Sequence, residues 1–577
     1  MLDPAALLSQ RLTDAICKAL GDEFRDTDPL LRSSQHSDFQ ANVAMPLAKR
    51  LGQKPRDIAA KIVENLEVSD LCAKVELAGP GFINLSLKAE TVAQALMTAL
   101  TSSTWAPPTT QKQTVVIDYS GPNVAKEMHV GHLRSTIIGD AFARIFTALG
   151  HQVIRQNHIG DWGTPFGMLI ELLLELGERQ GTELLSMGEL NQFYKIARMK
   201  FDSDQAFADR ARERVVKLQA LDTETLKFWK LLVDKSAEYF SRVYQELGIL
   251  LTPLDIRGES FYNPYLDGTV KELLELGIAR VDQEAVCVFP TGFVGREGEP
   301  LPLIIQKREG GYGYASTDLA ALRYRVRDLS ANRILYVVGS PQQQHFAMVF
   351  KTAEMAGWLT SGVRAEHVGF GSILGADKKM FKTRAGDTVR LIDLIEEAIT
   401  RARTVVSEKN PELGEETTEE VARQIGIGAL KYADLSSDRV KDYVFDYDRM
   451  LSFEGNTGPY LQYAHARICS IFRRAELDPS AASGPILIEA PQERALALHL
   501  LSFGNIVSNV AESLELQRLC TYLYELATLF MSFYEHCPVL KAETETLRTS
   551  RLAIARASAL TLKRGLGLLG IDAPERM

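Results

Sequence analysis

The sequence predicts an α/β protein with three domains: a small α+β domain, a central domain built on a parallel sheet with helical insertions, and an all-helical domain. Three observations lead to this prediction. A strand, a turn, a helix and a second strand follow one another between about residues 115 and 155, a Pro- and Thr-rich stretch precedes them, and helical patterning dominates after about Thr388. A strand–helix–strand unit places two parallel strands in one sheet. The length of 577 residues fits three domains with the middle one enlarged.

The first domain, expected over residues 1–107, opens with an amphipathic helix and contains a strand. Apolar residues recur at helical spacing at Leu8, Leu12, Ala15, Ile16 and Ala19. The run from Gly79 to Leu87 begins with Gly-Pro-Gly and continues with apolar residues, which is typical of a turn that leads into a strand. The stretch from Trp105 to Lys112 has the composition of a linker, so we expect a domain boundary there.

The central domain, expected over residues 108–445, begins with the β-branched strand Val115–Ile117. A helix is predicted over Leu133–Leu149 and stops at Gly150, and a second strand follows over Gly150–Arg155. Residues 165–250 are expected to form a helical insertion. Further strands of the same sheet are expected at Leu303–Gln306 and Arg333–Val338. The last domain, expected over residues 446–577, is predicted to be all-helical, with a loop over residues 478–492.

Charge and composition describe an ordinary globular protein. The chain has 65 Lys+Arg and 74 Asp+Glu, a net charge of −9, 46% apolar residues and 24% charged residues. These values exclude a disordered chain, a fibrous repeat and a disulfide scaffold, and they argue weakly against a protein that coats nucleic acid. The six cysteines form no CxxC pair, so no zinc finger or redox motif is expected. Without a signal peptide or a long apolar run, we expect a soluble cytoplasmic protein with no membrane span.

The turn after the first central strand carries the most informative residues. His129 and His132 are three residues apart where the helix should begin, so they share one face of it. A helix N-terminus offers unpaired N–H groups and a positive dipole end, which suit phosphate, and it lies here at the carboxyl end of a parallel strand. Gly131 between the histidines allows a flat ring to approach the backbone. Together these features predict a site for a nucleotide and its triphosphate.

Two other interpretations of the histidine pair are possible. A bare HxxH is often a surface or capping accident, and a metal site would need a third ligand that this motif does not supply. The nucleotide site is favoured by its context, which comprises a preceding strand and the residues Pro122, Asn123 and Lys126.

The string His129–His132 resembles the HIGH signature of class I aminoacyl-tRNA synthetases, and the longer string Ser120–Asp140 resembles the arginyl-tRNA synthetases among them. The motif proper comprises Pro122, Asn123, Val124, Ala125, Lys126, Glu127, Met128, His129, Val130, Gly131 and His132. Further matching strings are Gly160–Thr164, Tyr314–Asp318, Phe381–Gly386, Phe453–Thr457 and Gln462–Arg467. The resemblance implies a Rossmann-like catalytic domain, an N-terminal additional domain that contacts the tRNA elbow, and an anticodon-binding helical domain.

The resemblance also implies a reaction. ATP, as its Mg²⁺ complex, would activate L-arginine to arginyl-adenylate, and the arginyl group would pass to the 3′-terminal adenosine of tRNA(Arg) in protein synthesis. Positioning and charge stabilisation do most of the work in such in-line attack. His129 and His132 would donate to the phosphates, Gly131 would make room for the adenine, and Lys126 would add a positive charge. No structural zinc is implied, and the family suggests a monomer.

A second signature loop is expected at Lys379-Met-Phe-Lys-Thr-Arg384, which departs from the usual KMSKS pattern. One register equates Lys382 with the second signature lysine, whereas another leaves that lysine out and points to Lys126 instead. We therefore favour Lys126 first and Lys382 second. A solvated charged loop is the alternative for residues 378–384.

Arginine recognition requires acceptors for a rigid fork of guanidinium donors and an acceptor for the α-ammonium. The family pattern places these functions on five residues: Asp118, Asn123, Tyr314, Asp318 and Gln342. We assign the guanidinium to Asp318 and Tyr314 and the α-amino group to Asn123 and Gln342. Asp118 remains open between the two. Gly121 replaces a Ser found in some relatives, so no side-chain contact is expected there.

A basic stretch near the C-terminus is the candidate tRNA contact. Residues 546–571 contain no acid and five cations, namely Arg548, Arg551, Arg556, Lys563 and Arg564. They could follow phosphates or form the solvated side of an amphipathic helix, and the resemblance favours tRNA. Two other functions are alternatives: a different enzyme of the same nucleotidyl-transfer fold, or a catalytically silent tRNA-binding relative. The presence of His129, His132 and Lys126 argues against the silent relative.

Overall fold

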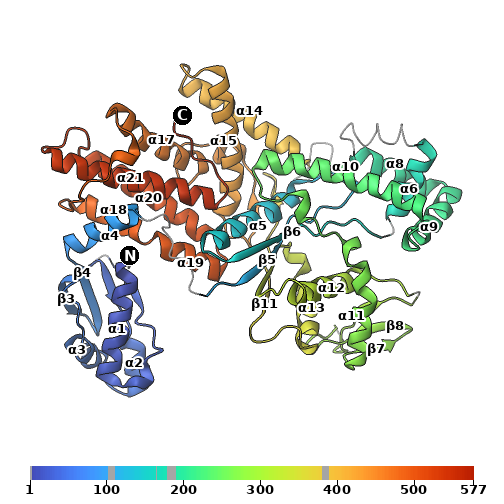
Figure 1. Cartoon of the computed structure of the whole chain (residues 1–577), viewed down its shortest axis with the longest axis horizontal. Helices are drawn as coiled ribbons and strands as arrows, with labels where there is room; N and C mark the ends of the chain where they lie inside the picture. The colour runs from blue at the N-terminus through green and yellow to red at the C-terminus, as the bar shows by residue number, and fades with distance from the viewer. Residues whose placement is uncertain are drawn as a thin grey trace.

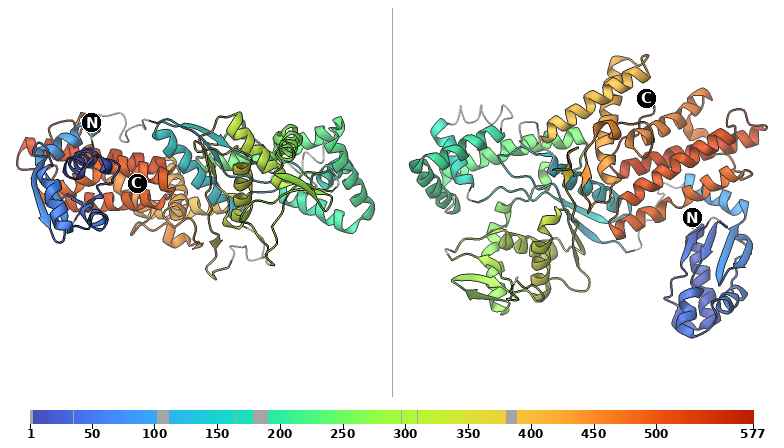
Figure 2. Two further views of the ribbon diagram at one scale, coloured as in Figure 1. Left: turned by 90° about the horizontal axis from the view of Figure 1, so that it is seen from below. Right: turned by 180° about the vertical axis from the view of Figure 1, so that it is seen from behind.

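The computed structural model describes residues 3–34, 36–101, 111–163, 165–177, 190–295, 297–308, 310–379 and 389–577. The N-terminal domain and the helical C-terminal domain lie together at one end of the molecule (Figure 1). The parallel sheet occupies the middle and a helical insertion forms the opposite end. Figure 2 shows the same order from below and from behind.

The N-terminal domain is an antiparallel sheet with helices, as predicted. Its strands lie in the order β1-β2-β4-β3. Their bounds are β1 (Leu31–Ser33), β2 (Phe39–Ala41), β3 (Cys72–Ala78) and β4 (Phe82–Leu87), and the helices are α1 (Pro4–Leu20), α2 (Ala44–Leu51), α3 (Pro55–Glu64) and α4 (Ala89–Thr101). Helix α1 buries Leu8, Leu12 and Ile16, so the amphipathic helix is confirmed.

The N-terminal domain docks on the helical domain through an ion pair and packed helices. Arg494 donates from Nε to Oδ1 of Asp38 at 2.9 Å and from Nη2 to the carbonyl of Leu87 at 2.7 Å. Helix α4 also packs along α18 (Pro491–Leu501). The first domain is therefore fastened to the C-terminal domain at the start of α18.

The central sheet contains four parallel strands in the order β11-β10-β5-β6. Their bounds are β5 (Thr114–Asp118), β6 (Gln152–Gln156), β10 (Arg333–Tyr336) and β11 (Arg364–His367). Helix α5 (Val130–Ala148) connects β5 to β6, which confirms the predicted strand–helix–strand unit. Because β6 lies on one side of β5 and β10 on the other, the strand order reverses between β5 and β10. Open α/β sheets bind ligands at the carboxyl ends of their strands at such a point.

The expectation that Leu303–Gln306 continues the central sheet is wrong. That segment is a strand, β9, but it belongs to a separate antiparallel sheet in the order β7-β8-β9. Strand β8 (Ala285–Val288) pairs with β9 and with β7 (Ala279–Asp282), with which it forms a hairpin. The nearby hairpin supplies the pairing partner, and a short apolar run carries no information about which sheet it will join.

Helices form most of the remaining described residues. The described part of the insertion contains α6 (Pro165–Leu176), α8 (Leu190–Ser203), α9 (Gln205–Gln219) and α10 (Thr223–Leu247). The segment from Val389 onward contains α14 (Leu391–Lys409), α15 (Glu415–Leu435), α16 (Tyr447–Met450), α17 (Gly458–Arg474), α18, α19 (Phe503–Ser513), α20 (Gln517–His536) and α21 (Glu545–Leu568). It is not wholly helical, because β13 (Tyr443–Val444) pairs with β12 (Ile373–Leu374). Within the described ranges, no helix combines the length and apolarity needed to cross a membrane.

Candidate active site at the carboxyl ends of the parallel strands

The histidine turn caps the first crossover helix with its own imidazoles. The N–H of Gly131 donates to Nδ1 of His129 at 3.0 Å, and the N–H of His129 donates to Nδ1 of His132 at 3.1 Å. The two ring centroids lie 4.0 Å apart. Both histidines therefore satisfy backbone donors that a helix start would otherwise leave unpaired.

The same contacts define which ring nitrogen carries the proton. Burial, together with the neighbouring His129, lowers the pKa of His132 to about 3. Burial and the charge of Lys126 lower the pKa of His129. Both rings are thus neutral at pH 7, and since each Nδ1 accepts a hydrogen bond, each proton is assigned to Nε2. The turn offers two neutral N–H donors at the positive end of a helix.

Gly131 has a local reason to be glycine. A Cβ at this position would lie 2.8 Å from Cε1 of His129, closer than real Cβ contacts. The glycine therefore permits the imidazole of His129 to fold back over the first turn of α5. Room for a flat ligand ring remains a prediction from the resemblance.

Helix α10 of the helical insertion forms hydrogen bonds with the loop that precedes the histidine turn. Oγ of Ser120, a residue with φ of +75°, lies 2.7 Å from the hydroxyl of Tyr244 on α10. The N–H of Ala125, with φ of +58°, donates to Oγ of Ser236, also on α10, at 2.9 Å. Such left-handed positions are costly for residues other than glycine and persist where the surroundings hold them. The insertion thus fixes a backbone conformation that the turn would not adopt alone.

Lys126 lies against the insertion. Its Nζ is 4.4 Å from the ring centroid of Tyr194 on α8, a cation–π contact. The next residue, Glu127, exchanges hydrogen bonds with Asn191 at the start of the same helix. The described structure therefore places the lysine of the motif beside the histidines, with its ammonium held over an aromatic face.

The second signature loop returns to the histidine turn. Lys382 lies outside the described residues. On its C-terminal side, the N–H of Val130 donates to the carbonyl of Val389 at 3.2 Å, and the N–H of Leu391 donates to that of Met128 at 2.9 Å. The chain leaving this loop therefore runs antiparallel to the start of α5.

Asp118 already has a cation within the protein. It ends β5, is buried, and its Oδ2 lies 2.8 Å from Nη2 of Arg325 on α12 (Tyr314–Arg327). Arg325 also donates from Nε to Oε1 of Gln156 at 2.6 Å, and its side chain is fully buried. Although burial opposes the charge, Asp118 and other partners raise the pKa of Arg325 well above its ordinary value. The Asp118 carboxylate thus ties α12 to the ends of β5 and β6.

The other candidate arginine contacts gather around the starts of two helices. Tyr314 and Asp318 lie one turn apart on α12. Tyr314 is 77% exposed. Oδ2 of Asp318 lies 2.6 Å from Nε2 of His345 on α13 (Gln343–Met355), and the exposed Gln342 immediately precedes that helix. Asn123 lies in the turn after β5, where its neighbours pair with Gly160.

Sequence reasoning missed an acidic cluster beside Asp318. Burial, together with the nearby Asp161 and Asp318, raises the pKa of Glu259 to about 8. The buried Asp161 accepts from the N–H and the hydroxyl of Ser260 at 2.8 and 2.6 Å. The strings Gly160–Thr164 and Gly258–Ser260 contained the acids, but nothing in the sequence indicated that they meet. These carboxylates offer a place where a cation would be favoured.

The five basic residues on α21 do not form one open face. Arg551 is buried, pairs with Glu493 at 2.8 Å and donates to the carbonyl of Pro538 at 2.9 Å. Arg556 donates to the carbonyl of Ala482 at 3.1 Å. Arg548 pairs with Glu545, Lys563 pairs with Glu575, and Arg564 is half-buried. In the described portion of the chain, no group of three His, Cys, Asp or Glu side chains could hold a metal ion.

The fold and the site together define a class. The family model described as "tRNA synthetases class I (R), catalytic domain" matches residues 92–447, which include the sheet and the histidine turn. The chain, with its parallel sheet and its histidine turn, is therefore a class I aminoacyl-tRNA synthetase. The models "DALR anticodon binding domain" and "Arginyl tRNA synthetase N terminal domain" match residues 461–577 and 6–87. The chain belongs to the arginyl-tRNA synthetase family.

Relatives match along the full length. The arginine–tRNA ligase of Thermobifida fusca (strain YX) is 55% identical over 577 residues, covering 100% of both chains. That of Cellvibrio japonicus (strain Ueda107) is 51% identical over 542 residues, covering 94% of each. The solved arginyl-tRNA synthetase of Plasmodium falciparum superimposes with a TM-score of 0.86 at 29% identity and covers 100% of both chains. That of Thermus thermophilus gives 0.81 at 25% identity, covering 99% of this chain and 100% of the other.

Proposed function

We propose how the described residues divide the work of an arginine–tRNA ligase. The enzyme activates L-arginine with ATP to arginyl-adenylate and pyrophosphate. It then transfers the arginyl group to the 3′-terminal adenosine of tRNA(Arg) and releases AMP. In the first step the arginine carboxylate attacks the α-phosphorus, and negative charge must be stabilised on the phosphate oxygens as the bond to pyrophosphate breaks.

One observation carries the assignment of the phosphate site. His129 and His132 are neutral, and their Nδ1 atoms are used by the backbone, so their Nε2–H groups remain as donors. We assign these donors to the phosphates of ATP, which enters as its Mg²⁺ complex, and we place the adenine over Gly131. Lys126 supplies a positive charge by leaving the ring of Tyr194, and Lys382 is the second candidate. A fixed, neutral donor needs no reorganisation when phosphate charge develops.

The acidic cluster supports an arginine pocket between α12 and α13. Asp318 and Tyr314 receive the guanidinium, with Glu259 and Asp161 near enough to Asp318 to strengthen its negative potential. Asn123 and Gln342 receive the α-amino end. Asp118 supports the pocket without binding the substrate itself, because its carboxylate accepts a hydrogen bond from Arg325. A guanidinium beside Glu259 would favour the ionised form of that carboxyl.

The partners follow from the three regions. We assign residues 1–107 to the tRNA elbow, 108–445 to catalysis and 446–577 to the anticodon, with the first boundary outside the described residues. On α21, Arg548, Arg556, Lys563 and Arg564 are the candidates for phosphate contacts, whereas Arg551 supports the helix internally. We expect a monomer that acts in the cytoplasm, where protein synthesis takes place.

Charging of total tRNA with radiolabelled arginine tests the function, and ATP–pyrophosphate exchange with and without tRNA tests the first step. We expect arginine charging, and arginine-dependent exchange only when tRNA is present. Charging with another amino acid in place of arginine would refute the specificity. Robust exchange without tRNA would refute the expected tRNA dependence.

A further inference from the structure

Two fully buried charges join the histidine helix to α15, the helix on which α17 of the helical domain packs. Nε of Arg134, in the second turn of α5, lies 3.0 Å from Oδ2 of Asp434 on α15. Both residues are only 1% exposed. Arg134 is two residues after His132, so the pair is attached to the turn that carries the phosphate donors.

The surroundings of Arg134 link it to the second signature loop. Its Nη1 donates to the carbonyl of Lys441 at 3.1 Å. Its guanidinium carbon lies 5.3 Å from the ring centroid of Tyr443 and 5.8 Å from that of Phe370. Tyr443 belongs to β13, whose partner β12 leads into the loop that contains Lys382. One guanidinium therefore contacts α15, the segment Lys441–Tyr443 and Phe370.

A second contact between the same helices lies farther along α5. Asp140 of α5 is buried, and burial lowers the pKa of Lys431 on α15 to about 8 although the negative charge of Asp140 opposes this shift. The Lys431 ammonium also donates to the carbonyl of Gly570, just beyond the end of α21. A Cβ on Gly570 would lie 2.9 Å from Nζ of Lys431 and 3.3 Å from Oδ2 of Asp140, so these groups converge there. Asp140, Lys431 and Gly570 thus meet at a second contact between α5 and α15.

Stability alone does not account for such an interface. A buried ion pair is often no more stabilising than well-packed apolar residues of similar volume, because both charges must be removed from water. What it adds is a requirement that the two charges stay together, because separating them would leave a buried charge uncompensated. Near the start of α5, this requirement holds the helix that carries His132 against α15.

We propose that Arg134 and Asp434 are positioning residues for adenylate formation, which fix the histidine turn relative to α15, the helix on which the helical tRNA-binding domain packs. The proposal rests on the assignment of His132 as a phosphate donor. Neither residue touches substrate; they act through the placement of His132 and of the strand pair that leads to the second signature loop. Docking of the helical domain and alignment of the donors then become one event.

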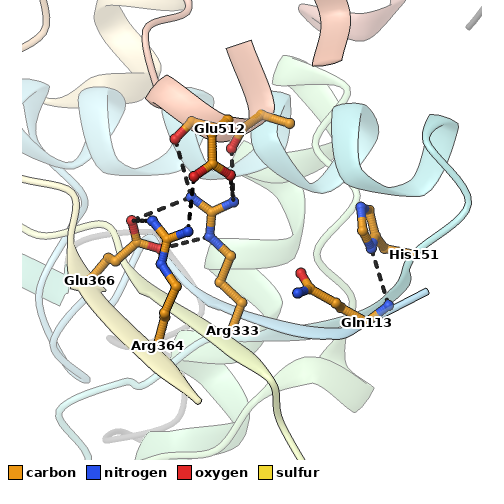
Figure 3. Close-up of polar contacts among 7 residues, drawn as sticks. Gln113, His151, Arg333, Arg364, Glu366 and Glu512 are labelled. Carbon is orange, nitrogen blue, oxygen red and sulfur yellow. Dashed lines mark hydrogen bonds and ion pairs between the residues drawn. The ribbon is translucent and has the colours of Figure 1, made fainter. Parts of the chain in front are cut away.

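A matched interdomain contact lies away from the histidines. Arg333 begins β10 and donates from Nε to Oε2 of Glu366 at 2.6 Å and from Nη1 to the carbonyl of Ala511, near the end of α19, at 2.9 Å. Figure 3 shows it between Glu366 and Glu512, with Arg364 beside it. Arg333 is also buried, but it lies at the amino ends of the strands, opposite the site. It joins the central domain to the helical domain without contacting α5 near His132.

The experiment compares two double variants of the full-length enzyme. Arg134→Met/Asp434→Leu replaces the positioning pair by apolar residues, and Arg333→Met/Glu366→Leu does the same to the control pair. Each is measured for its thermal unfolding midpoint, for arginine affinity by equilibrium dialysis, and for kcat and arginine KM in ATP–pyrophosphate exchange with tRNA present. Asp434→Asn, which keeps the shape of the side chain, is a second variant if the first does not fold.

We expect the positioning variant to fold and to keep its arginine affinity, while its kcat falls by about tenfold or more because a small misplacement of a catalytic group has such effects. The control variant should keep the wild-type kcat. A wild-type kcat in the folded positioning variant, or an equal loss in the control, would overturn the proposal. His132→Ala tests the role of His132 separately from that of the ion pair. If this variant retained full activity, the assigned role of His132 would be wrong, whatever the double variant showed.

Discussion

Arg325 donates to Asp118 across 2.8 Å at the carboxyl end of the central strand, so this carboxylate is neutralised from inside the protein. We expect Asp118→Asn to lower the free energy of unfolding by about 3–5 kcal/mol, because it leaves a buried guanidinium without its counter-ion. Urea unfolding measures this change. Asp318→Asn is the control: its carboxylate is partly exposed and should raise the arginine KM with little change in stability. The assignment fails if Asp118→Asn weakens arginine binding and leaves stability intact.

The two nitrogens of His132 should be separable by substitution. A glutamine amide can place an N–H near the position of Nε2, whereas an asparagine oxygen can replace Nδ1 as the acceptor of the His129 N–H. We expect His132→Asn to lose about 10²–10³ in kcat, as when one donor to developing charge is removed, and His132→Gln to lose less. Steady-state exchange kinetics with tRNA measure both. Equal losses in the two variants would contradict the role of Nε2–H.

Arginine binding should depend on the ionisation of Glu259. Its pKa is about 8 without ligand, and a guanidinium nearby favours the ionised carboxylate, so arginine binding releases a proton below pH 8. We therefore expect affinity to rise with pH between about 6 and 8, by at most about tenfold per pH unit, and to level off above 8. Equilibrium dialysis at four pH values measures this, and Glu259→Gln should flatten the profile. A profile that stayed unchanged in Glu259→Gln would show that another group titrates.

The same carboxyl should affect stability with the opposite sign. Its pKa is raised above its ordinary value, so between about pH 4.5 and 8 the folded protein holds a proton that the unfolded chain has released. The contribution of Glu259 to the free energy of unfolding therefore falls as pH rises through this range. Comparing urea unfolding of the wild type and Glu259→Gln at pH 5 and 8 isolates it. A difference that grew with pH in favour of the wild type would reverse the sign and refute the assignment.

Two cations on α21 should behave differently although the sequence presents them alike. Lys563 has a side chain that is 55% exposed, and Lys563→Ala should raise the tRNA KM and reduce the salt dependence of binding by about one phosphate contact. Arg551→Met should lower the free energy of unfolding instead, because the carboxylate of Glu493 is fully buried. tRNA binding over a range of salt concentrations and urea unfolding separate the two effects. The distinction is lost if Arg551→Met affects only tRNA affinity.

The sequence was sufficient where the signal is local. The strand before Asp118, the helix start at His129 and the amphipathic helix at the N-terminus follow from periodicity and capping, which depend on near neighbours. The sheet of Leu303 was misassigned because strand pairing is decided by distant segments. For the same reason, the sequence did not reveal that Arg325 would reach Asp118, or that Glu259 would lie beside Asp318. Long-range electrostatics determine which of the motif's polar residues face substrate and which hold the fold.

The contact between Asp38 and Arg494 affects how the enzyme would select a tRNA by its shape. Because the first domain is fastened to α18, the surfaces that we propose for the tRNA elbow and for the anticodon would move as one rigid body. A tRNA bound at both surfaces would place its 3′ end at a distance that is fixed by the separation of the two surfaces. The acceptor end would then reach the histidine turn only when the body of the tRNA has the right length and bend. Shape would thus be checked before chemistry begins.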